Sequence, residues 1–119
     1  MKRTGPMRLE LRKLIDDLRR ASYKNNAPIW KRVAEDLAKP SRQRRIVNVY
    51  KIEKYAKDNE TVVVPGKVLG IGELRKKVTV AAFDFSSQAI EKINKVGKAI
   101  GIRELLEKNP KGSNVRLLG

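Results

Sequence analysis

Pro40 divides the chain into two parts with different sequence patterns. Proline lacks a backbone N–H and disfavours helical angles at the residue before it, so a helix is expected to end by Lys39. The segment from Lys39 to Arg45 holds four cations, and Ile46 to Val49 follows with the branched side chains typical of a buried strand. The chain must therefore place a constrained cationic loop directly beside a core, at the junction between helix and sheet.

The cations of this loop are candidates for binding phosphate groups. They are Lys39, Arg42, Arg44 and Arg45. Guanidinium groups can grip phosphate oxygens bidentately, and a short tethered loop projects them together. The alternative is a solvated charge cluster at the edge of the domain, because a run of charges usually forms a solvated surface.

The net charge of the chain favours phosphate binding over that alternative. Its 119 residues include 28 Lys and Arg against 13 Asp and Glu, a formal net charge of +15. Such a charge destabilises an isolated compact chain and attracts polyanions, so a nucleic acid is the expected partner. Residues 1–45 hold 14 of the cations but only 5 of the carboxylates. Further candidate phosphate contacts are Lys2 and Arg3 in the N-terminal tail, Arg75, Lys76 and Lys77 in a loop, and Lys111 in the C-terminal tail.

The composition also argues against several functions. No apolar run approaches the roughly 20 residues of a transmembrane helix, and no signal-peptide hydrophobic stretch follows the N-terminal tail. The chain has no cysteine and no histidine, which excludes disulfides, thiol nucleophiles and the usual zinc sites. No cofactor is expected, and a cytoplasmic location is compatible with the absence of cysteine.

The apolar pattern predicts one α/β domain with a helical N-terminal arm over about 7–39, a body over about 46–108 and basic tails at both ends. The arm contains two amphipathic helices separated by a turn at 25–28, with an asparagine cap and Pro28 in the first turn of the second helix. In the body, Pro65 and Gly66 are expected to end the second strand. Strands are expected at 46–49, 61–64, 78–83 and 98–102, and helices at 50–57, 87–96 and 103–107.

Two features invite a functional interpretation but favour a structural one. Trp30 could stack on a base, yet its apolar neighbours on the second helix favour packing in the core. Gly66, Gly70 and Gly72 could cradle a phosphate, but their spacing matches no known phosphate-loop motif, so tight turns are expected.

No catalytic constellation is evident in the sequence. The serines have no histidine to activate them, and the carboxylates are scattered. Asp84 lies at a strand end, where catalytic acids do occur, but the adjacent Ser86 and Ser87 favour a helix cap there. We therefore expect a protein that is not an enzyme. A small enzyme acting on a phosphorylated substrate, suggested by the glycine stretch, is the weaker interpretation.

The distribution of charge favours structured RNA over DNA. No helix carries a compact row of Arg and Asn suited to reading bases in the major groove, and no strand carries an aromatic RNA-binding signature. Cations dispersed over loops and both tails suit a folded RNA recognised by its shape and phosphates. A DNA-binding chromatin or regulatory protein that uses the N-terminal helix pair is the alternative hypothesis.

Several long motifs also resemble a known family. They are KRTGP at 2–6, AKPSRQRRIVNV at 38–49, VPGKVLGIGEL at 64–74, VTVAAFDFS at 78–86 and LLEKNPKGS at 105–113. They resemble the family of archaeal large-ribosomal-subunit protein eighteen-e, which has a eukaryotic counterpart and is related to bacterial large-subunit protein fifteen. The resemblance covers the chain from residue 2 to about residue 112.

This resemblance implies a structural component of the large ribosomal subunit in the cytoplasm, with ribosomal RNA and neighbouring ribosomal proteins as partners. It also implies an irregular superhelix of strand–strand–helix turns with the helical arm at its N-terminus. The glycine stretch would then be a strand–turn element of that superhelix.

Overall fold

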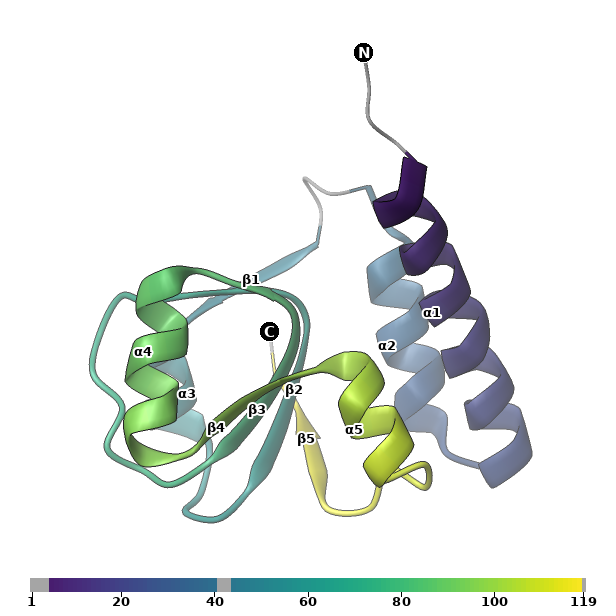
Figure 1. The fold of residues 1–119 in the computed structure, drawn as a ribbon. Coiled ribbons are helices and arrows are strands. Elements are labelled where there is room, and N and C mark those ends of the chain that lie inside the picture. Colours follow the sequence, from purple (N-terminus) through teal and green to yellow (C-terminus); the bar gives the residue numbers. More distant parts are fainter. Residues whose placement is uncertain (1–4, 41–43, 119) are drawn as a thin grey trace.

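The computed structural model describes residues 5–40 and 44–118, with side chains from residue 9 onward, so Lys2, Arg3 and Arg42 lie outside the described residues. Helices and strands alternate through the body of the chain (Figure 1). In order, the elements are α1 (Gly5–Asn25), α2 (Pro28–Ala38), β1 (Arg45–Asn48), α3 (Val49–Tyr55), β2 (Thr61–Leu69), β3 (Thr79–Phe85), α4 (Ser87–Val96), β4 (Lys98–Gly101), α5 (Ile102–Lys108) and β5 (Val115–Leu117).

Every strand pairing in the described sheet is parallel. The strand order is β1-β2-β3-β4, and β5 also pairs with β2. β1 pairs with residues 66–69 of β2 and β5 pairs with residues 61–63, so these two short strands share one side of β2. Neighbouring parallel strands need crossover connections. The chain therefore winds from β1 to β4 as a superhelix, which confirms the predicted α/β class.

The sheet separates two hydrophobic cores. Successive side chains of a strand point to opposite faces, so Val62 and Val64 pack with α3 and α4, whereas Val63 packs with α1, α2 and α5. The continuous apolar runs of β2 and β3 are what a strand buried on both faces requires. Trp30 is fully buried in the first core, and its Nε1 donates to the carbonyl oxygen of Pro110 at 2.8 Å. The prediction that Trp30 packs in the core is confirmed.

The second strand does not end at Pro65 as predicted. β2 runs on to Leu69, and its pairing with β3 shifts register between Val64 and Lys67. A proline can occupy this central strand because the hydrogen-bond ladder is interrupted at the position where Pro65 has no N–H to donate. Gly66 is required there, since a Cβ would lie 1.9 Å from the carbonyl oxygen of Arg45 on β1.

The second helix begins differently from the prediction. Its N-cap residue is Ala27, whose side chain makes no capping hydrogen bond, and Pro28 occupies the first turn as expected. Asn26 instead adopts the left-handed backbone region, with φ of 51°, where asparagine is tolerated better than most residues. The helix ends at Ala38, and Lys39 is extended with ψ of 154°, as Pro40 dictates.

The C-terminal region is more ordered than a basic tail. Residues 115–117 form β5, and the N–H of Leu118 donates to the carbonyl oxygen of Val63 at 3.0 Å. Leu118 is buried in the second core. β5 therefore pairs with one side of β2 at residues 61–63, where the sequence predicted only a tail.

Candidate nucleic-acid interface

A cationic groove runs between α1 and the segment that follows α2. It has a volume of about 890 Å³, and its apolar lining residues are Leu11, Ile15, Leu37, Ala38 and Pro40. Four cations and one carboxylate also line it, namely Arg12, Arg19, Lys39, Arg44 and Asp16. The groove therefore combines a net positive rim with a concave surface, which suits an anionic chain more than a flat charged surface does.

Asp36 fixes two of the cations predicted to bind phosphate. This residue is only 4% exposed, and its carboxylate accepts a hydrogen bond from Arg45 Nε at 2.8 Å and pairs with Lys39 Nζ at 3.1 Å. Burial alone would raise the pKa of Asp36, but the hydrogen bonds from Lys39 and Arg45 outweigh it and hold the pKa below its usual value. Arg45 is therefore engaged with a buried partner, whereas Lys39 stays half exposed at the groove.

Arg44 is positioned by contacts to two elements. Its Nε donates to the carbonyl oxygen of Leu37 at 3.1 Å, and its guanidinium carbon lies 5.7 Å from the centre of the Phe83 ring. A cation over an aromatic face is attracted by the ring quadrupole. These contacts hold Arg44 at the groove and leave guanidinium N–H groups besides Nε to bind a ligand.

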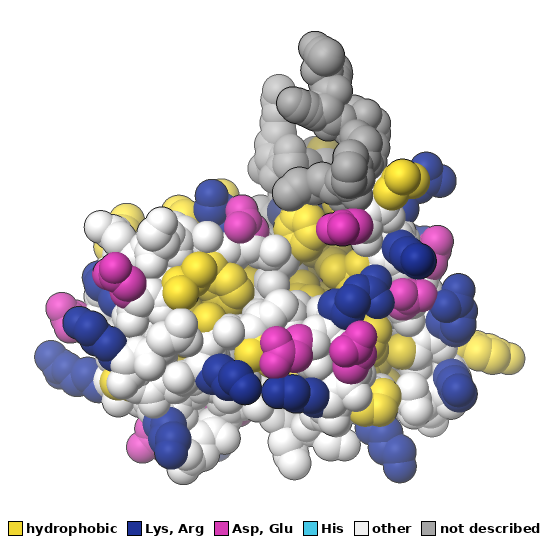
Figure 2. Space-filling view, in the orientation of Figure 1, with side chains coloured by type: hydrophobic (Ala, Val, Ile, Leu, Met, Phe, Trp, Pro, Cys, Tyr) yellow, Lys and Arg dark blue, Asp and Glu magenta, His cyan; other side chains and the backbone are white. Residues whose placement is uncertain are grey.

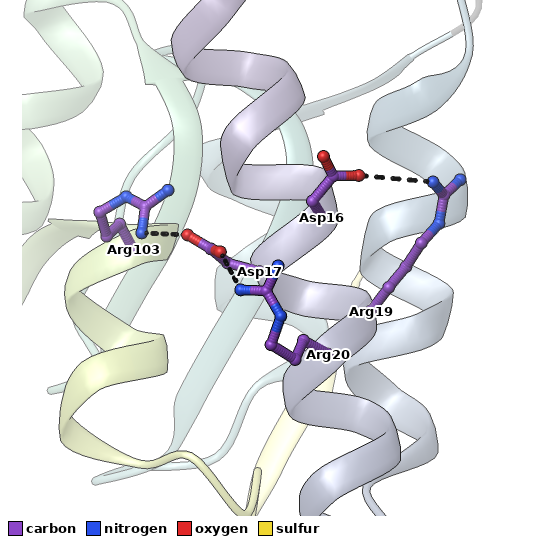
Figure 3. A network of polar contacts seen from close by, with 5 residues as sticks. All are labelled: Asp16, Asp17, Arg19, Arg20 and Arg103. Carbon is purple, nitrogen blue, oxygen red and sulfur yellow. Dashed lines mark hydrogen bonds and ion pairs between the residues drawn. The ribbon is translucent and has the colours of Figure 1, made fainter.

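The opposite flank of α1 is tied to α5 by an ion-pair network (Figure 3). Asp17 accepts from Arg103 at 2.9 Å and from Arg20 at 2.8 Å. The hydrogen bond from Arg103 is the main reason that the pKa of Asp17 lies below its usual value. Burial opposes this effect, and the charge of Arg103 and the contact with Arg20 add to the lowering. By contrast, Asp16 and Arg19 lie 4.0 Å apart, and both are more than half exposed. Arg19 is thus loosely paired and accessible at the groove.

The cluster Arg75–Lys77 lies in a loop that is anchored through its backbone. Glu53 Oε1 accepts hydrogen bonds from the N–H groups of Arg75 at 2.9 Å and Lys76 at 3.2 Å. These hydrogen bonds lower the pKa of Glu53, and the one from Arg75 has the larger effect. Lys76 Nζ donates to the carbonyl oxygen of Ala56 at 2.8 Å. Arg75 and Lys77 are exposed to solvent, whereas Lys76 is half-buried and helps to hold the loop in place.

The predicted cations therefore do not form one site. The groove brings Lys39 and Arg44 together, while Arg75, Lys76, Lys77 and Lys111 are not among its lining residues. Figure 2 shows Lys and Arg at several separate places on the visible face, with Asp and Glu among them. Arg12 and Arg19 line the groove but were not among the cations predicted to bind phosphate. Their spacing of seven residues places them on one stripe of α1, which was the signal available.

The glycine stretch faces a cation rather than an anion. Lys92 Nζ donates to the carbonyl oxygens of Gly70 and Gly72, at 2.7 and 2.6 Å. A phosphate loop would present N–H groups instead. Ser86 caps α4 by accepting from the N–H of Ala89 at 3.2 Å, as the capping interpretation predicted. Within residues 5–40 and 44–118, no group of three potential metal ligands gathers.

None of the helices described is both long enough and apolar enough to cross a bilayer.

Comparisons with known proteins point to one family. Residues 10–101 match the model of the family described as ribosomal proteins 50S-L15, 50S-L18e and 60S-L27A. A large ribosomal subunit protein eL18 of Archaeoglobus fulgidus is 60% identical over 88% of this chain and 91% of its own length. Proteins of the same name from Sulfurisphaera tokodaii and Haloarcula marismortui are 55% and 49% identical, over 98% and 99% of this chain and 96% and 99% of theirs.

Proposed function

Because this chain belongs to the family of ribosomal proteins 50S-L15, 50S-L18e and 60S-L27A, we propose that it is a structural component of the large ribosomal subunit and binds ribosomal RNA. The family consists of structural ribosomal proteins and not of enzymes. The expected partners are large-subunit ribosomal RNA and neighbouring ribosomal proteins, and the expected location is the ribosome.

The groove between α1 and the segment after α2 is the observation that carries RNA binding. Arg12, Arg19, Lys39 and Arg44 line it with a single carboxylate, Asp16, and this geometry suits a curved phosphate backbone. The other predicted contacts that the structure describes are not among the residues that line the groove: Arg45, Arg75, Lys76, Lys77 and Lys111. Lys2, Arg3 and Arg42 remain predicted contacts outside the described residues.

Arg45 is the weakest of these candidates, because its Nε is already bonded to buried Asp36. In this proposal it supports the loop, and Arg44 makes the phosphate contact. The double substitution Arg42→Ala with Arg44→Ala is expected to weaken RNA binding while the domain stays folded.

The groove is tested by binding to a large-subunit ribosomal RNA fragment and to a DNA duplex of equal length across a salt series. Arg12→Gln combined with Arg19→Gln should lower RNA affinity and reduce the log–log salt slope by about 1.4–1.8, since each phosphate contact contributes about 0.7–0.9. A matched control is Lys31→Gln with Arg32→Gln, two exposed cations of α2 that are not among the groove residues. Equal losses in both variants would show that total charge, and not the groove, determines the affinity.

The alternative is a DNA-binding protein that uses the α1–α2 pair. In Figure 1 the two helices lie side by side and antiparallel, whereas the helices of a helix-turn-helix cross at about 90–120°. The same experiment decides between the two, because a DNA-binding protein would prefer the duplex at equal salt.

A further inference from the structure

The outer side of α3 carries two tyrosines and two lysines. Val49 and Ile52 are fully buried in the second core, which turns the opposite side of this helix outward. Residues three or four positions apart are neighbours on a helix surface, which links Tyr50 to Lys54 and Lys51 to both Lys54 and Tyr55. These four residues are here called the α3 face. Tyr50 is 54% exposed and Tyr55 is 48% exposed.

None of the four residues of the α3 face is acidic. Glu53 is the single carboxylate of this helix, and it accepts the N–H groups of Arg75 and Lys76 in the neighbouring loop. Lys54 Nζ lies 5.3 Å from the centre of the Tyr55 ring. Within the described part of the chain, no carboxylate lies within 4.0 Å of the amino group of Lys51 or Lys54.

Tyr50 is held on a rigid support. Its N–H donates to the carbonyl oxygen of Ile71 at 3.1 Å. Gly72, with φ of +104°, packs so closely that a Cβ on it would lie 2.4 Å from Tyr50 Cβ. Lys92 fixes the same loop through the carbonyl oxygens of Gly70 and Gly72. The loop and the helix therefore place Tyr50 before any partner arrives, which lowers the entropic cost of binding.

We propose that the α3 face binds unpaired nucleotides of RNA, with the tyrosines stacking on bases and the lysines pairing with the flanking phosphates. Aromatic platforms interleaved with cations are typical of single-stranded nucleic-acid sites. The cores of protein–protein interfaces are also rich in tyrosine, but they are depleted of lysine. A base within a duplex is already stacked, so only unpaired nucleotides can use the rings.

This inference rests on the proposed function and adds a second contact to it. α3 belongs to the core on the opposite side of the sheet from α1 and α2. The α3 face and the cationic groove would thus touch different parts of a folded RNA, the groove through phosphates and the α3 face through unpaired bases.

The test compares the full chain with Tyr50→Leu plus Tyr55→Leu for binding to an unstructured adenine-rich RNA strand and to an RNA duplex. Base–aromatic stacking contributes about 1–3 kcal/mol per base, so each tyrosine lost should weaken single-strand binding at least about fivefold. Duplex affinity should stay unchanged. Tyr23→Leu is the matched control, because Tyr23 is 92% exposed on α1 and should leave both affinities unchanged.

An unchanged single-strand affinity would overturn the inference, and so would an equal loss for strand and duplex. If the double variant kept its single-strand affinity but no longer joined other large-subunit proteins, the α3 face would be a protein contact and the inference would be wrong. Its failure is distinguishable from failure of the proposed function. In the first case the parent chain still prefers ribosomal RNA over DNA, and in the second it does not.

Discussion

The carboxylate of Asp36 joins the two ends of the cationic segment from Lys39 to Arg45. A buried charge is costly unless it is paired, and here two cations from opposite ends of the segment pair with it. Arg45 Nε makes the shorter contact, at 2.8 Å, and is itself only 24% exposed. The energetic role of Arg45 is therefore expected to differ from that of an exposed cation.

Arg45→Ala is expected to lower the free energy of unfolding by about 2–3 kcal/mol. This is below the roughly 3–5 kcal/mol for breaking a fully buried pair, because Lys39 still accompanies the carboxylate. Urea unfolding measures the change. Lys67→Ala is the control, since its pair with Asp84 spans 3.8 Å with both side chains about half exposed, and it should cost at most about 0.5 kcal/mol. Equal costs would contradict a structural role for Arg45.

The pH dependence of the same variant identifies Asp36 as the partner. The folded-state pKa of Asp36 is lowered, so its stabilising contribution is present above its unfolded pKa, near 3.9, and is lost as the pH falls through the folded value. The difference between the parent and Arg45→Ala should therefore be constant at neutral pH and shrink in the acid range. A difference that persisted after the carboxylate is protonated would assign the loss to packing instead.

At the level of elements, local patterns predicted most of the fold and missed what depends on distant pairing. The helical periodicity before Pro40 and the apolar runs at 62–64 and 80–82 led to the right elements, because their side chains repeat with the period of each structure. β5 is three residues long, and it forms only because one side of β2 is available for pairing. The local sequence predicts a strand end at Pro65, because nothing near it reveals the register shift that accommodates the proline.

The same distinction applies to the candidate site. The high density of cations after α2 is visible in the sequence alone. Arg12 and Arg19 line the same groove as Lys39 and Arg44 only because α1 packs against α2 in the folded protein. The hydrogen bond between Arg45 and Asp36 likewise depends on the folded position of Asp36, nine residues away in the sequence.

A chain ended after Asn114 is expected to be less stable by at least about 2 kcal/mol and to aggregate. It loses the pairing of β5 with β2 and the buried side chain of Leu118, and it exposes a side of β2 as an unpaired edge. Urea unfolding and light scattering measure the two effects. Arg116→Ala is the control, because it removes the 2.9 Å contact with Glu60 while keeping the strand. A truncated chain as stable as this control would show that β5 contributes little.

At the level of the whole molecule, a charge of +15 on 119 residues opposes the folded state. The close ion pairs of Asp17, Asp36 and Glu60 offset only part of this repulsion, because the remaining cations are spread over the surface. Salt screens exposed charges beyond about 8–10 Å and leaves buried contacts largely intact. Long-range repulsion should therefore weaken with salt more than the buried Asp36 contact does.

The thermal midpoint of the free protein is accordingly expected to rise when NaCl increases from low salt to about 0.5 M. A gain of about 1 kcal/mol would raise it by roughly 4 °C for a domain of this size, and differential scanning calorimetry measures it. Lys31→Gln with Arg32→Gln removes two exposed cations, so this variant should start from a higher midpoint and respond less to salt. A midpoint that fell with NaCl would mean that attractive ion pairs outweigh repulsion in the free chain. The energetic need for a polyanionic partner would then be lost, and RNA binding would have to rest on the groove and the α3 face alone.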